Sequence, residues 1–329
     1  MITYTNPLPF ALRHYAIELE QTLARVGTSS NQILVPAVEG LPSVGGKIRM
    51  LTRAWGNAWG TRAHASASNI QIWPSLGLAE MLLWRQSRGH RHYVILHDPV
   101  PLRRQVGFDY LSRWVASRAT GKTMPVVIVH SASAEIEARR ALPNFDVVRL
   151  PHPIVSAHLV SPAPVEPVVI VAGQYKPERD LRLLRGLGPL FGAAGIRGRI
   201  QGRGWPEVPG WEVIDEFIPE DQLDALLLSA SAVLLPYRNY FQSGIALRAL
   251  ELGALFVSTR TSFAEDVLCS SSRLIYDEPT PQAAFTAIEA AIGRRSEASQ
   301  IFQRYIRLVD RHWARAPWVV PEASRPQSD

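Results

Sequence analysis

The 329-residue chain has a single cysteine, Cys269, and only three lysines, Lys47, Lys122 and Lys176. One thiol excludes an internal disulfide and any metal site built from several thiolates, and we expect Cys269 to be a small buried group. No run of about 18 apolar residues occurs, and the first residues lack a basic segment followed by an apolar stretch. We therefore expect a cytoplasmic protein that touches a membrane at most from outside.

Charged residues are also scarce, at 19% of the sequence, yet the net charge is +6. The excess is confined to one half, because residues 1–160 carry 17 basic and 9 acidic side chains whereas the rest carries 18 and 20. A basic half is compatible with nucleic acid, an anionic membrane surface or an anionic substrate. The sequence has no helix-turn-helix, zinc-finger or RNA-binding signature, so we expect no nucleic acid partner.

Short apolar runs alternate with longer helical patterns, which is typical of parallel sheets covered by helices in α/β proteins. In the first half we predict strands at 2–5, 32–35, 69–73, 93–96, 126–130 and 147–150, and helices near 10–26, 46–59, 78–87, 107–119 and 134–142. In the second half we predict strands at 168–172, 196–201, 211–214, 232–236, 255–259 and 273–276, and helices near 180–191, 219–229, 244–252, 281–293 and 297–314. Each half is predicted to be one doubly wound, Rossmann-like domain.

Five prolines between residues 150 and 167 predict a linker, because proline removes backbone donors and favours extended neighbours. The predicted organisation is a domain at 1–155, a linker at 156–167, a domain at 168–296, a C-terminal helix at 297–316 and a tail at 317–329. The C-terminal helix has apolar residues largely on one face. It packs either on the second domain or back on the first, and the sequence leaves both open.

Open parallel sheets bind ligands beyond the carboxyl ends of their strands, where the strand order reverses. After the strand at 232–236, the polar segment RNYFQSG places Ser243 and Gly244 at the start of a helix. Free backbone N–H groups and the positive end of a helix dipole bind phosphate, and Gly244 lets an anion approach the backbone closely. Taken alone, this Ser-Gly pair is better explained by Ser243 acting only as an N-cap.

The segment VVIVAGQYKPERD combines a strand, a glycine turn at Gly173 and a loop with two cations, Lys176 and Arg179. Such a pair could neutralise a diphosphate leaving group, with arginine making forked contacts. A solvated loop in which Glu178 and Asp180 are local partners is an equally good explanation. The sequence has neither GxGxxG nor GxxxxGK[ST], which argues against dinucleotide-binding and P-loop classes.

In the first half, His97 and Asp98 follow a predicted strand, where they could act as a base, an orienting pair or a partner for a hydroxyl. Lone histidines are more often structural, and that alternative stays open. A serine after His130 is expected to cap the next helix. His152, at the linker, is expected either near a cleft or, slightly favoured, packed at a hinge. We predict no metal site.

Taken together, these segments resemble the nucleotide-sugar-dependent glycosyltransferases of the GT-B fold, in which two Rossmann-like domains face a cleft. The resemblance spans most of the chain and is strongest at 168–259. VLLPYRNYFQSGIALRALELGA resembles the donor-site motif of exopolysaccharide mannosyltransferases of the xanthan-assembly type. The segments NIQIWPS, LHDP, HP and KPER occur in the order expected for that group.

The resemblance implies a hexosyltransferase that moves a mannose-like or glucose-like sugar from a GDP- or UDP-sugar to a hydroxyl of a glycan or lipid-linked acceptor. It implies no metal and no other cofactor, and a peripheral contact of the basic first domain with the inner face of a membrane. His97 and Asp98 match the acceptor side, where one of them would take the acceptor's proton. The implied donor site comprises Gly173, Lys176, Arg179, Phe217, Ile218, Tyr237, Ser243 and Gly244.

Within that set, Lys176 and Arg179 match the contacts to the diphosphate, and Phe217 and Ile218 match the place where the base is held. The sequence departs from the retaining branch of these enzymes at three positions. Tyr240 and Arg248 stand where that branch has a Glu-x7-Glu motif, and Gln174 stands where it has arginine. A non-catalytic nucleotide-sugar-binding subunit of the same fold is therefore one alternative, and a nucleotide-sugar epimerase of the same fold is another. The sequence does not fix the anomeric outcome.

Overall fold

The structure, a computed structural model, describes residues 1–35, 52–56, 58, 68–86, 90–101, 105–121, 123–158, 164 and 166–319. Most of the helix predicted at 46–59 and of the tail predicted at 317–329 lies outside these residues. The chain divides into a first unit, Met1–Ser156 with Leu308–Asp329, and a second unit, Ala157–Arg307. Helix α10 (Ala298–Trp313) begins in the second unit and ends in the first. Among the described helices, none combines the length and apolarity needed to span a bilayer.

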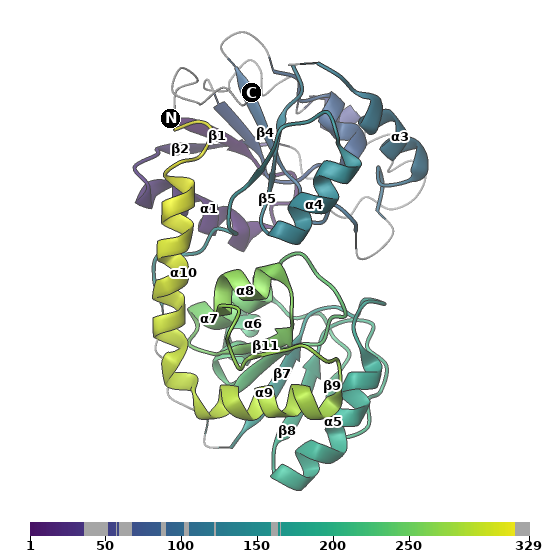
Figure 1. The fold of residues 1–329 in the computed structure, drawn as a ribbon, viewed down its shortest axis with the longest axis vertical. Helices are drawn as coiled ribbons and strands as arrows, with labels where there is room; N and C mark the ends of the chain where they lie inside the picture. The colour runs from purple at the N-terminus through teal and green to yellow at the C-terminus, as the bar shows by residue number, and fades with distance from the viewer. Residues whose placement is uncertain are drawn as a thin grey trace. The chain divides into compact units, whose positions relative to one another are not determined.

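The first unit contains a parallel six-stranded sheet of order β2-β1-β3-β4-β5-β6 (Figure 1). Its strands are β1 (Ile2–Thr5), β2 (Ser30–Ile33), β3 (Ser68–Gln71), β4 (Arg91–Ile95), β5 (Val126–Val129) and β6 (Val147–Arg149). Its helices include α1 (Arg13–Arg25), the 3-10 helix η1 (Gly77–Leu82), α3 (Tyr110–Arg118) and α4 (Ala132–Ala141). All four residues of β5 are buried, as expected for a central strand covered on both faces.

The second unit repeats this architecture with a parallel sheet of order β12-β11-β10-β7-β8-β9. Its strands are β7 (Val168–Ala172), β8 (Arg197–Gln201), β9 (Trp211–Ile214), β10 (Ala232–Leu235), β11 (Phe256–Thr259) and β12 (Ile275–Tyr276). Its helices are α5 (Leu181–Ala194), α6 (Glu220–Leu228), α7 (Gly244–Glu251), α8 (Ser262–Leu268) and α9 (Pro281–Gly293), with the short 3-10 helix η2 (Arg295–Glu297) before α10. Helices α5 and α9 pack side by side, as do α6 and α7, and Figure 1 shows these pairs on opposite sides of β7 and β11.

The C-terminal part of α10 belongs to the first unit through specific contacts. Trp313 is fully buried and its Nε1 donates to the carbonyl oxygen of Pro151 at 2.9 Å. Arg25 of α1 pairs with Asp310, with 2.9 Å between Nε and Oδ1. The C-terminal end of α10 therefore packs back on the first domain, which is one of the two arrangements that the sequence left open.

Three local predictions were wrong, and one helix was not predicted. Strand β2 is two residues earlier than predicted because Ile2 pairs with Ser30, so the start of β1 sets its register. The helix predicted at 78–87 is the shorter 3-10 helix η1, and α8 was not predicted. Cys269, predicted to be buried, is half-buried at the end of α8 with φ of 68°.

Candidate donor site and acceptor-side cluster

The carboxyl edge of the second sheet contains a topological switch point between β7 and β10. The chain proceeds from β7 outward to β8 and β9, then returns to β10 on the other side of β7. Gly173 directly follows β7 and Tyr237 lies two residues beyond β10, so both lie at this switch point. Open α/β sheets bind their ligands at such a position.

Arg179 joins the loops around the switch point. Its guanidinium carbon lies 4.8 Å from the ring centroid of Trp205 and 4.7 Å from that of Tyr237, and Nη2 donates to the carbonyl oxygen of Ala172 at 2.8 Å. The side chain is only 4% exposed, and this burial lowers its pKa. Arg179 therefore holds together the ends of β7, β8 and β10. Its Nε is buried and has no hydrogen-bond partner among the described residues.

The glycine turn after β7 allows a close approach of two backbones. Gly173 has φ of 94°, and Gly202, which follows β8, has φ of 150°. A Cβ atom on Gly202 would lie 2.2 Å from the carbonyl oxygen of Gly173, so only glycine fits there. Lys176 is half-buried, and within the described residues its ammonium has no hydrogen bond or ion pair. Its charge is thus available to an anion.

Helix α7 begins at the predicted position. Ser243 is the N-cap, and its Oγ accepts a hydrogen bond from the N–H of Ala246 at 3.3 Å. The expected cap is confirmed, and the cap leaves the first N–H groups of α7 to other partners. Among the described residues, a Cβ atom on Gly244 would meet nothing within 4 Å, and Gly244 is exposed. In the described part of the chain, no hydrogen bond or ion pair joins Ser243 or Gly244 to Lys176 or Arg179.

The two positions that depart from the Glu-x7-Glu pattern are occupied by side chains with structural partners. Tyr240 is 1% exposed and its hydroxyl donates to Ser258 Oγ at 2.8 Å; burial raises its pKa to about 12. Arg248 makes two hydrogen bonds to Asp224, of 2.6 and 2.5 Å, and lies 3.6 Å from a carboxylate oxygen of Glu251. Neither position offers a carboxylate to a substrate.

The loop after β9 holds the residues predicted to contact the base. Phe217 is 64% exposed and the guanidinium carbon of Arg203 lies 5.2 Å from its ring centroid. Ile218 is half-buried. The N–H of Gly204 donates to Asp215 at 2.5 Å, which joins the loops after β8 and β9. An exposed aromatic ring beside a cation is a surface on which a planar ring can stack.

His97 lies at the carboxyl edge of the first sheet, two residues after the end of β4. It is 5% exposed, its Nε2 lies 3.0 Å from the carbonyl oxygen of Ile72, and its ring stacks on Trp73 at 5.5 Å between centroids. Because a carbonyl only accepts, Nε2 carries the proton and Nδ1 bears the lone pair in the neutral ring. Asp98 beside it is half-buried. The pair is therefore placed as predicted at a strand end.

Tyr15 of α1 connects His97 to two further histidines that follow β5 and β6. Its ring centroid lies 4.7 Å from that of His97 and 5.0 Å from that of His152. The Tyr15 hydroxyl lies 2.7 Å from Nε2 of His130, whose Nδ1 lies 2.8 Å from the carbonyl oxygen of Leu150. That carbonyl requires a proton on Nδ1, so Nε2 accepts from the hydroxyl. Burial lowers the pKa of His130 well below its usual value and that of His152 to about 3, so both are neutral near pH 7.

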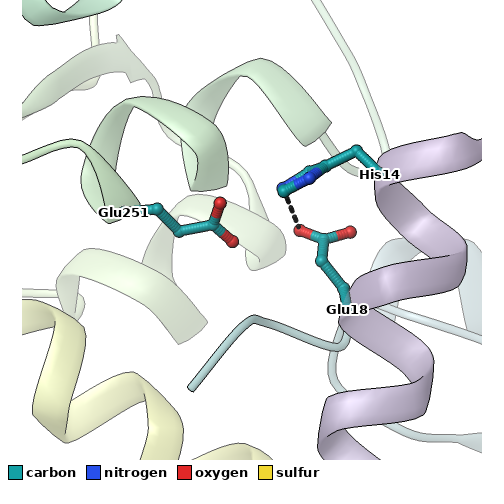
Figure 2. Close-up of side chains that lie close together, drawn as sticks. All are labelled: His14, Glu18 and Glu251. Atoms are coloured by element: carbon teal, nitrogen blue, oxygen red, sulfur yellow. Dashed lines mark ion pairs between the residues drawn. The ribbon is translucent and has the colours of Figure 1, made fainter. Parts of the chain in front are cut away.

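The cluster continues along α1. Figure 2 shows His14 and Glu18 paired on successive turns of the helix, with 3.6 Å between Nε2 and Oε1. Glu18 is 1% exposed and its other oxygen lies 3.9 Å from Nδ1 of His152. Glu251, also drawn in Figure 2, belongs to α7 of the second unit. His152, predicted to pack at a hinge or to lie near a cleft, is buried among side chains of the first unit.

No protein-family model and no curated protein matches the sequence. Among solved structures, TarM has a TM-score of 0.56 at 11% identity, over 78% of this chain and 55% of TarM. An E. coli trehalose-6-phosphate structure bound with UDP-2-fluoro glucose has a TM-score of 0.57 at 12% identity, over 83% and 77%. The chain has the GT-B fold. Sucrose-phosphate synthase from Thermosynechococcus elongatus matches with a TM-score of 0.61 at 12% identity, over 95% of this chain and 94% of that one. The chain spans little more than half the length of TarM.

The resemblance to GT-B enzymes is thus confirmed at the level of the fold. The structure brings Gly173, Arg179 and Tyr237 together, and it places Phe217 and Ile218 on a neighbouring loop of the same sheet edge. The sequence did not point to Trp205, or to the contacts of Tyr15 with three histidines. The signal for the histidine cluster was present, because a histidine follows each of three consecutive strands that are neighbours in the sheet.

Proposed function

We propose that the protein is a glycosyltransferase that moves a hexose from a GDP- or UDP-sugar to a hydroxyl of a glycan or lipid-linked acceptor. The observation that carries this proposal is the switch point of the second sheet, where a glycine turn, an available lysine and an open helix N-terminus follow β7 and β10. The shared fold supports it, since the solved structures above include a sugar-phosphate synthase and one bound to a UDP-sugar.

In this proposal Lys176 and the start of α7 at Ser243 and Gly244 stabilise the negative charge that develops on the departing diphosphate. Arg179 supports them by fixing the loops around the switch point. Phe217 and Ile218 hold the base. These groups supply the positive charge without a metal ion, although the second half of the chain has no net positive charge.

On the acceptor side, His97 and Asp98 are the proposed groups that receive the proton of the attacking hydroxyl. The bond between Nε2 of His97 and the Ile72 carbonyl fixes the tautomer, which leaves Nδ1 as the basic atom. The edge-on contact with the buried Tyr15 ring holds the His97 ring in place. This arrangement favours a direct displacement, because Tyr240 and Arg248 provide no carboxylate at the positions used in the retaining branch.

The proposal is tested by mixing the protein with UDP-glucose or GDP-mannose, and following release of the nucleoside diphosphate together with calorimetric binding. Lys176→Ala is the decisive variant, since the Lys176 side chain makes no hydrogen bond or ion pair with the described residues. Loss of one charge-assisted contact predicts about 10- to 100-fold weaker turnover. Arg182→Ala, which removes an exposed cation of the next helix, is the matched control. Equal turnover of the Lys176→Ala variant and wild type would refute the assignment.

A non-catalytic nucleotide-sugar-binding subunit is the second candidate. The partners of Tyr240 and Arg248 favour it, since both side chains are held by the fold. It predicts calorimetric binding of a nucleotide sugar with no release of nucleoside diphosphate in the presence of any acceptor. The same pair of measurements therefore separates the two candidates.

A further inference from the structure

Helix α3 presents an apolar stripe to solvent. Tyr110 is 84% exposed, Leu111 65% and Trp114 44%. With 3.6 residues per turn, these three side chains lie within about 100° of one another around the helix axis. Helices of soluble domains normally turn such a stripe toward the core, so an outward stripe with two aromatic rings indicates an interaction surface.

The stripe lies beside a groove between α3 and α4, which pack against each other (Figure 1). The groove has a volume of about 320 Å³, and Val100, Tyr110 and Trp114 provide much of its apolar lining. Leu111 is not part of the lining and is exposed, so it forms a ridge beside the groove. A surface that carries a ridge next to a groove can pack on a copy of itself, because a two-fold axis places each ridge against the other groove.

The charged side chains of α3 and α4 are largely engaged within the first unit. Two ion pairs of 2.8 and 2.6 Å lie on α4, Arg139 with Glu135 and Arg140 with Glu137. On α3, Arg113 donates from Nε to the carbonyl oxygen of Phe108 at 3.1 Å, and the guanidinium carbon of Arg118 lies 4.3 Å from the centroid of the Trp114 ring. The groove is lined by charges of both signs, from Arg113, Glu137 and Arg140. Such a surface complements a second copy of itself better than a partner of one strong charge.

The exposed apolar area matches what a stable dimer needs. At roughly 200 Å² for an aromatic side chain, Tyr110 and Trp114 together expose roughly 250 Å². Three aliphatic side chains also contribute, namely Leu111, Val100 at 39% exposure and Ile136 at 59%. Ile136 lies one helical turn before the groove residue Arg140 and so on the same face of α4. At roughly 120 Å² for an aliphatic side chain, these three add roughly 200 Å². Two copies would bury roughly 900 Å² of apolar surface, which corresponds to roughly 1,400 Å² in total at the apolar fraction of about 65% found in homodimers. Stable interfaces bury about 1,200 to 2,000 Å².

We propose that two copies of the chain form a two-fold symmetric dimer through the α3/α4 surface, which is defined by Val100, Tyr110, Leu111, Trp114 and Ile136. The ridge at Leu111 of each copy enters the groove of the other, and the aromatic rings of both copies lose their contact with water. The groove extends to Pro99, so the interface adjoins the strand end at Asp98. The dimer requires no substrate and is independent of the proposed function.

The test is analytical ultracentrifugation of the full chain over a range of concentrations. The wild-type chain of 36.5 kDa is expected to reach twice that mass at micromolar concentration. The double variant Leu111→Ser with Trp114→Ser is expected to dimerise at least about 100-fold more weakly, because each lost side chain counts twice in a two-fold interface. The matched control is Phe10→Ser with Leu34→Ser, which removes a ring and a leucine that are 82% and 87% exposed elsewhere in the unit. Circular dichroism of each variant verifies folding.

Hydrogen exchange of the wild-type chain locates the interface without any substitution. Backbone amides of α3 and α4 are expected to exchange more slowly in the dimer than in the diluted monomer, whereas those of α5 are expected to exchange equally in both. A wild-type chain that stays monomeric at all concentrations would overturn the proposal. A dimer that the double variant forms as well as wild type would also overturn it, as would equal weakening in the control variant, or α3 amides that exchange equally in monomer and dimer.

Discussion

Glu80 of η1 is a carboxylic acid with no exposed surface, and its burial predicts a distinctive dependence of stability on pH. Its oxygens accept hydrogen bonds from the N–H of Leu76 at 2.8 Å, Nε1 of Trp84 at 3.0 Å and Nε2 of Gln71 at 3.2 Å. Burial raises its pKa from 4.5 to about 7, although these donors act in the opposite direction. Glu80 thereby fixes the turn after β3 that carries Trp73, the residue stacked on His97.

Between pH 4.5 and 7 the folded chain keeps a proton on Glu80 that the unfolded chain has released. The free energy of unfolding therefore falls as pH rises through this window, by at most about 1.4 kcal/mol per pH unit. The total loss is roughly 3 kcal/mol. The contribution is fully present below pH 4.5 and is lost above pH 7.

Two buried histidines change the free energy of unfolding with pH in the opposite direction. The pKa of His130 and that of His152 lie below the usual 6.5, so their contribution to stability is present above pH 6.5 and is lost as pH falls. The two trends partly cancel in the wild-type protein. A comparison with Glu80→Gln removes this overlap, because the variant keeps both histidines.

The assay is urea unfolding of wild type and Glu80→Gln across the range from about pH 5 to about pH 8. Relative to wild type, the unfolding free energy of Glu80→Gln is expected to rise by roughly 3 kcal/mol as pH rises. Glu207→Gln, a change at an exposed carboxylate, serves as the control and is expected to follow wild type. A difference between wild type and Glu80→Gln that does not change with pH would refute the reasoning.

Other parts of the structure give three further predictions. Burial lowers the pKa of His152 to about 3, and His152→Asn removes this titrating group. Between pH 6.5 and about pH 5 the variant should therefore lose about 2 kcal/mol less unfolding free energy than wild type, as acid titration of unfolding would measure. Gly202→Ala places a Cβ atom 2.2 Å from the carbonyl oxygen of Gly173, so thermal unfolding should show a loss of about 3 kcal/mol; an unchanged Tm would contradict this contact. Tyr240→Phe should lower the free energy of unfolding by about 1 kcal/mol through the lost hydrogen bond to Ser258. Tyr240→Glu should lower it by several kcal/mol through burial of a carboxylate. Equal Tm values for the two variants would show that the site is not buried.

Most strands were predictable because parallel buried strands are short, continuous apolar runs. β5, β7 and β10 stand out in this way, and each has the predicted boundaries to within one residue. β2 was misplaced because its residues SNQI are half-exposed and polar, so pairing with β1 rather than local composition determines its position. The seven-residue helix α8 escaped prediction because only its cap, Thr261, distinguishes it from a loop.

Site residues were predictable where their role depends on their place between a strand and the next helix. They were not predictable where their role depends on packing between distant segments. Ser243 at the start of α7 and Gly173 at the end of β7 follow from strand-turn-helix order. The burial of Arg179 between two aromatic rings does not, because Trp205 lies 26 positions later and meets it only through the order of β7 and β8. In the same way, Tyr15 meets the histidines only because β4, β5 and β6 are adjacent.

The central claim is that the start of α7 binds the diphosphate of a nucleotide sugar, and Gly244→Ala tests it most directly. Among the described residues, a methyl group there meets no atom within 4 Å outside its own helix backbone and chain neighbours, so we expect the fold to be kept while the methyl group occupies space that a phosphate needs. Gly192→Ala in α5, where a Cβ atom also meets nothing within 4 Å, is the matched control. Calorimetry with UDP- and GDP-sugars should show binding to wild type and Gly192→Ala, and affinity reduced about tenfold or more in Gly244→Ala. Equal affinity of all three proteins, or no binding of either donor to wild type, would contradict the account.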